Sequence, residues 1–129
     1  YFKILEMMKR KGIDTSKLFF VDAVSKMTNK TKKNNDTSSF ISSPGSLTEL
    51  SLLLNNLINT GKFKFLFIDS LSTLLIYNDL KTAEQFSHYL ISRLRNSNTI
   101  GIITSIAKED SREALLDFIV QLCDKHLYL

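Results

Sequence analysis

The chain has 129 residues, 43% of them hydrophobic, which suits one domain with an ordinary core. Its longest apolar runs, Phe65–Ile68 and Leu74–Tyr77, fall far short of the roughly 20 residues that cross a bilayer, and no charged-then-apolar leader opens it, so we expect a cytoplasmic protein. The net charge of +4 permits weak attraction to polyanions, but the basic clusters at 9–11 and 26–33 contain no interleaved aromatic residues, so we do not expect a nucleic-acid partner.

The first residues predict a helix. Tyr1, Ile4, Leu5 and Met8 recur at helical spacing, and Gly12 follows as a helix end. No capping residue precedes this helix, so we expect that the chain begins inside a structured element and that part of the protein lies upstream.

A strand and a polar segment come next. Leu18–Val21 is a short apolar run that ends at Asp22, a pattern typical of a buried strand. From residue 25 to residue 39 only Met27 is apolar, so this stretch cannot bury enough surface to hold itself in place. We therefore expect a polar, mobile loop over 25–39, followed by a brief strand at Phe40–Ile41.

The clearest helix precedes the most informative strand. Ser46 and Glu49 match a capping box, leucines then line one helical face, and Gly61 closes the helix. Residues 64–70 read Lys-Phe-Leu-Phe-Ile-Asp-Ser, which predicts a buried strand that ends in the carboxylate of Asp69. An apolar turn or short helix over 71–79 leads away from it.

The remaining elements repeat the alternation of helix and strand. Thr82 and Gln85 match a second capping box, in front of a helix that ends near Asn96. Residues 99–103 are β-branched and predict a buried strand, 111–123 predict a last helix, and 126–129 a final strand. Alternating elements with continuous apolar strands predict an α/β fold in which helices cover both faces of a parallel sheet.

Polar residues stand where the predicted strands end. They are Asp22, Asp69 with Ser70, and Thr104 with Ser105. The carboxyl ends of parallel strands share one edge of the sheet, where α/β proteins bind ligands. The alternative is that these residues cap helices or turns, as such side chains commonly do. Because a buried carboxylate needs a partner or a metal, Asp69 is the leading candidate for a ligand site.

Other chemistries lack their motifs. The pair Gly61-Lys62 precedes a strand and has no glycine five residues earlier, so it is not a phosphate-binding loop. No G-x-S-x-G is present to hold a serine nucleophile. His88, His126 and Cys123 lack the paired spacing of zinc ligands, and we expect His88 at the surface and Cys123 in the core.

The order of these elements resembles the RecA/KaiC-like family of P-loop ATPases. Residues 65–72, Phe-Leu-Phe-Ile-Asp-Ser-Leu-Ser, are similar to that family's Walker B strand, and 11–25, 46–57 and 99–105 resemble the elements around it. The resemblance implies a three-layer α-β-α fold with a mainly parallel sheet. It also implies that Asp69 holds Mg²⁺ for ATP, that Ser70 supports it, and that Thr104 lies near the γ-phosphate.

One departure from that family is large. The P-loop strand, its glycine-rich loop and its helix have no counterpart in the 129 residues. We therefore expect a single domain over 1–129 that corresponds to the C-terminal two-thirds of the family's fold and has no catalytic residues of its own. It would be a non-hydrolysing regulatory or interaction module, with a second copy or another protein as partner.

Two alternatives stay open. The chain is a fragment of an active Mg-ATP-dependent ATPase if a P-loop lies upstream of Tyr1. A weaker alternative is a nucleic-acid-binding accessory protein that uses the Lys26–Lys33 loop.

Overall fold

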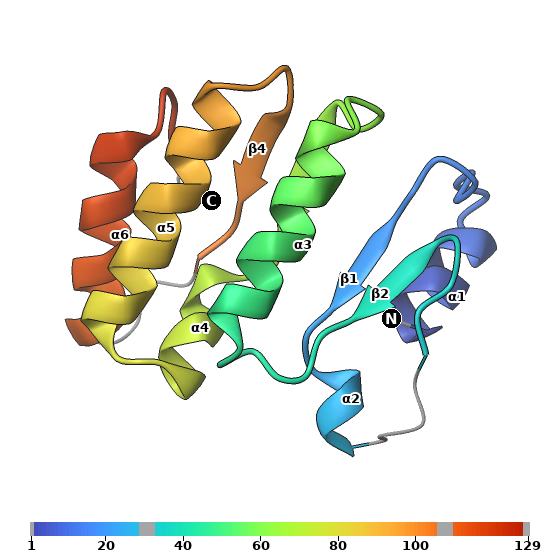
Figure 1. Ribbon diagram of the computed structural model, residues 1–129, viewed down its shortest axis with the longest axis horizontal. Coiled ribbons are helices and arrows are strands. Elements are labelled where there is room, and N and C mark those ends of the chain that lie inside the picture. The colour runs from blue at the N-terminus through green and yellow to red at the C-terminus, as the bar shows by residue number, and fades with distance from the viewer. Residues whose placement is uncertain (1, 29–32, 106–109, 128–129) are drawn as a thin grey trace. The chain divides into compact units, whose positions relative to one another are not determined.

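The computed structural model describes residues 2–28, 33–105 and 110–127, and the chain in it is a mixed α/β protein with short parallel strands. Its elements follow in chain order (Figure 1): α1 (Phe2–Arg10), β1 (Phe20–Asp22), α2 (Ser25–Thr28), β2 (Ser38–Phe40), α3 (Leu47–Asn59), β3 (Phe65–Ile68), α4 (Leu71–Tyr77), α5 (Leu80–Arg95), β4 (Ile100–Ile103) and α6 (Asp110–Leu122). They form two compact units, residues 1–46 and 47–129, which are described separately.

The first unit holds α1, α2 and a parallel pair of strands. Phe20 of β1 lies opposite Ser38 of β2, and the amide of Phe20 donates to the Thr37 carbonyl at 2.9 Å. The serines of β2 are buried although they are polar. Asparagine side chains accept hydrogen bonds from this strand: Asn34 Oδ1 accepts from the Phe40 amide at 2.8 Å, and Asn35 Oδ1 accepts from the Ser38 hydroxyl at 3.0 Å. Part of the predicted 25–39 loop is therefore ordered as α2 and β2.

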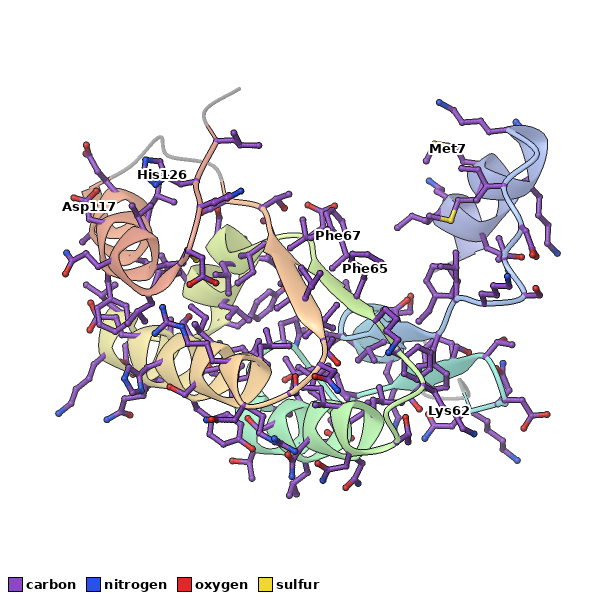
Figure 2. The ribbon with its side chains drawn as sticks, turned by 90° about the horizontal axis from the view of Figure 1, so that it is seen from above. Met7, Lys62, Phe65, Phe67, Asp117 and His126 are labelled. Carbon is purple, nitrogen blue, oxygen red and sulfur yellow. The ribbon has the colours of Figure 1, made fainter. Side chains whose placement is uncertain are left out.

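The second unit is built on the parallel pair of β3 and β4. Phe65 lies opposite Ile100 and Phe67 opposite Ile102. Helices α3 and α5 lie along one face of this pair, and α6 packs against α5 (Figures 1 and 2). The buried side chains of this unit come mainly from the helices: Leu54, Ile58, Leu71, Leu74, Ala83, Phe86, Leu90, Ile91, Leu94, Leu115 and Ile119.

Gly101 allows α5 to lie close to β4. A Cβ atom on Gly101 would stand only 2.7 Å from Cδ1 of Leu94, whereas ordinary contacts are 3.4–4 Å. A residue without a side chain is thus used where a helix approaches a strand.

Two sets of side-chain hydrogen bonds stabilise the helices of this unit. Asp79 caps α5, since its Oδ1 accepts from the Thr82 amide at 2.8 Å and its Oδ2 accepts from the Thr82 hydroxyl at 2.9 Å. The predicted capping box at Thr82 and Gln85 is therefore wrong: the helix begins one turn earlier, because the carboxylate of Asp79 takes the capping position.

Arg93 links α5 to α3: its Nε donates to Asn55 Oδ1 at 2.6 Å and its Nη2 to Asn59 Oδ1.

The other face of the β3–β4 pair carries exposed apolar side chains. Phe65 and Phe67 are 64% and 60% exposed, and Ile100 and Ile102 are 59% and 45% exposed. Figure 2 shows Phe65 and Phe67 projecting to the side opposite α3 and α5. We call these four residues the open sheet face. The predicted strand is present, but among the described residues of this unit helices cover one face of the pair, where the sequence predicted cover on both.

At the carboxyl end of the chain, Lys125, His126 and Leu127 form no strand, so the described part of the predicted final strand is wrong. The rest of that strand lies outside the described residues. No helix in the described ranges combines the length and the apolar character that a bilayer crossing requires.

Candidate functional site

Asp69 and Thr104 occupy equivalent positions, each directly after its strand, and the parallel register brings them together. The Thr104 amide donates to the Ile68 carbonyl at 3.0 Å, which extends the ladder by one residue. The Thr104 hydroxyl lies 3.0 Å from Asp69 Oδ1 and 3.2 Å from the Ile68 carbonyl oxygen. The Thr104 hydroxyl is the donor in both contacts. Both residues are exposed, and the structure thus joins two residues that the sequence singled out.

The start of α4 completes this site. Its first amide, of Leu71, donates to the Thr104 carbonyl at 3.1 Å and ties the helix to the end of β4. The hydroxyls of Ser72 and Ser105 are 3.0 Å apart and make a second link between the same segments. Asp69, Thr104, Ser72 and Ser105 therefore form one polar cluster, which we call the strand-end cluster. The peptide bond between Asp69 and Ser70 is cis.

Ser70 has a local role. It is the N-cap residue of α4 with extended backbone angles, and its hydroxyl lies 3.2 Å from that of Thr73 in the first turn. The Ser70 side chain makes no capping hydrogen bond to the helix, so the capping alternative that the sequence left open is not met by this side chain. The sequence did not single out Ser72 and Thr73 as site residues, although hydroxyl residues in the turn after a strand-end carboxylate are a visible signal.

Oxygen atoms are all that the strand-end cluster offers to a ligand. One exposed carboxylate with hydroxyl groups suits water or a hard cation such as Mg²⁺. Among the described residues, however, no group of three or more His, Cys, Asp and Glu side chains could hold a metal ion. A cation at Asp69 would therefore need further ligands from water or from a bound phosphate, which is how Mg²⁺ is usually held.

Asp22, the second candidate, ends β1 in the first unit and is used locally. Its Oδ1 accepts from the amides of Val24 and Ser25 at 2.9 and 2.8 Å, and its Oδ2 accepts from the Ser25 hydroxyl at 2.6 Å. Partial burial raises the pKa of this carboxyl, but the hydrogen bonds outweigh it and hold the pKa at about 2. These contacts match a turn-forming role.

The remaining residues that the sequence weighed lie apart from the strand-end cluster. His88 is exposed, as predicted, and lines a cavity of about 390 Å³ between α5 and α6 with Lys81, Glu84, Gln85 and Phe118. Cys123 is partly buried, and burial, with the charge of Asp124, raises the pKa of its thiol, so it stays protonated at neutral pH.

Half of the basic segment Lys26–Lys33, residues 29–32, lies outside the described residues. Of its described lysines, Lys33 is exposed, whereas the Lys26 ammonium lies 3.4 Å from the Phe40 carbonyl oxygen and donates to it. Lys26 is therefore engaged in the fold of the first unit.

Comparison with known proteins connects the chain to a protein family. No curated protein and no solved structure matches the chain. A family profile matches residues 8–129, which include both strand pairs and the strand-end cluster. The chain therefore belongs to a family of unknown function, DUF7504.

Proposed function

We propose that this chain is a RecA/KaiC-like domain that acts in the cytoplasm as a non-hydrolysing regulatory or interaction module. The observation that carries the proposal is the joined pair of Asp69 and Thr104 at the ends of two parallel strands, in a sequence without a phosphate-binding loop. Asp69 stands where the family's Walker B carboxylate would hold Mg²⁺. The proposal includes that family's three-layer α-β-α fold with its mainly parallel sheet.

The chain's own residues fit the metal half of a nucleotide site and not its phosphate half. Asp69 is exposed and could bind Mg²⁺ through a water molecule. A triphosphate also needs a run of backbone N–H groups on a glycine-rich turn and a lysine beside it, which the 129 residues do not supply. The Thr104 hydroxyl is already engaged with Asp69. We therefore expect nucleotide affinity weaker than micromolar, and no turnover.

The interaction role rests on the open sheet face. Parallel sheets occur almost only with both faces covered. Side chains such as Phe65 and Phe67, each more than half exposed, lose apolar contact with water when another surface covers them. A second copy or another protein is the partner that we propose.

Titration calorimetry with Mg-ATP, together with a phosphate-release assay, tests the nucleotide half of the proposal. The wild-type chain is compared with Asp69→Ala and with Asp117→Ala, which removes an exposed carboxylate from α6 instead. We expect no phosphate release and no micromolar binding for any of the three. The non-hydrolysing role would be refuted if the wild-type chain and Asp117→Ala both bound Mg-ATP with micromolar affinity and released phosphate, while Asp69→Ala did neither.

Binding of the dye ANS, which fluoresces on exposed apolar surface, tests the interaction half. Phe65→Ser with Phe67→Ser should reduce the dye signal of the wild-type chain. Leu52→Ser is the matched control, because Leu52 is 62% exposed but lies on α3. The dye is added at a concentration at which sedimentation shows the wild-type chain to be monomeric, so that a second copy does not cover the face. An unchanged signal in the double variant would then mean that the open sheet face is not accessible in the free chain, and the interaction role would fail.

The second candidate function is a fragment of an active ATPase. The contact between Asp69 and Thr104 is equally compatible with it, since a Walker B carboxylate beside a hydroxyl would suit a working site as well as a degenerate one. The gene sequence upstream of Tyr1 decides: G-x-x-x-x-G-K-[ST] there, with ATPase activity of the longer protein that depends on Asp69, would establish this candidate. An upstream sequence without that motif would exclude it.

A further inference from the structure

We draw no further inference here: the strongest candidate, the open sheet face that Phe65, Phe67, Ile100 and Ile102 form on the β3–β4 pair, already supports the proposed function, and nothing in the structure shows which molecule or segment covers it.

Discussion

Replacing Gly101 by alanine tests the packing of α5 on β4. The new Cβ would lie 2.7 Å from Leu94 Cδ1, so one of the two groups must move by about 1 Å to reach an ordinary contact. Leu94 is 7% exposed and has little room. Overpacking of this kind costs about 1–3 kcal/mol, and alanine regains about 0.4–1 kcal/mol by restricting the unfolded chain. The difference spans about 0–2.6 kcal/mol, and because Leu94 is buried we expect a net loss in the middle of that span, about 1–2 kcal/mol.

Urea denaturation followed by circular dichroism measures this loss. The midpoint should fall by roughly 0.5–1 M, given the usual denaturant sensitivity of small domains. Leu94→Ala alone should cost about 2–5 kcal/mol, because it leaves a cavity. In the double variant the added methyl group enters the space that Leu94 vacates. The loss of stability in the double variant should therefore be smaller than the sum of the losses in the two single variants. Strict additivity, or a Gly101→Ala variant as stable as the wild type, would refute the proposed close approach.

Three further predictions concern polar contacts. Asp79→Ala should lower the urea midpoint of unfolding through loss of the α5 cap, and an unchanged midpoint would contradict that role. Because the pKa of Asp22 is about 2 instead of 3.8, its stabilisation is complete above about pH 4 and is lost as the pH falls toward 2. Asp22→Ala should thus cost about 1 kcal/mol near pH 7, after allowance for solvent screening, and a gap that persists to pH 2 in acid titrations would be evidence against this. Thr104→Val should cost less than about 1 kcal/mol in thermal melts, because its bond to Asp69 is exposed, and a larger loss would show that the contact is buried.

Much of the second unit was predictable because its signals are local. The leucine stripe and Gly61 predicted α3, and Gly61 indeed has the positive φ of +64° that favours glycine after a helix. The meeting of Asp69 and Thr104 followed from one rule, that carboxyl ends of parallel strands share an edge.

The errors have physical causes as well. Strand β2 is polar, and Asn34 and Asn35 accept hydrogen bonds from the Phe40 amide and the buried Ser38 hydroxyl, a form of support that hydrophobic periodicity does not detect. Asp79 lies three residues before the Thr82-x-x-Gln85 sequence, so two residues could cap this helix. In the structure Asp79 is the N-cap of α5. The apolar run 65–68 identified β3 but contains no information on what lies against Phe65 and Phe67.

The link from Arg93 to Asn55 and Asn59 has a consequence for solution conditions. Its acceptors are amide oxygens that neither titrate nor carry a net charge, and its donors are the N–H groups of a guanidinium. Counter-ions weaken attraction between opposite charges, but this link contains only one charge. The α3–α5 contact should therefore tolerate concentrated electrolyte and wide changes of acidity that would loosen a contact made by ion pairs.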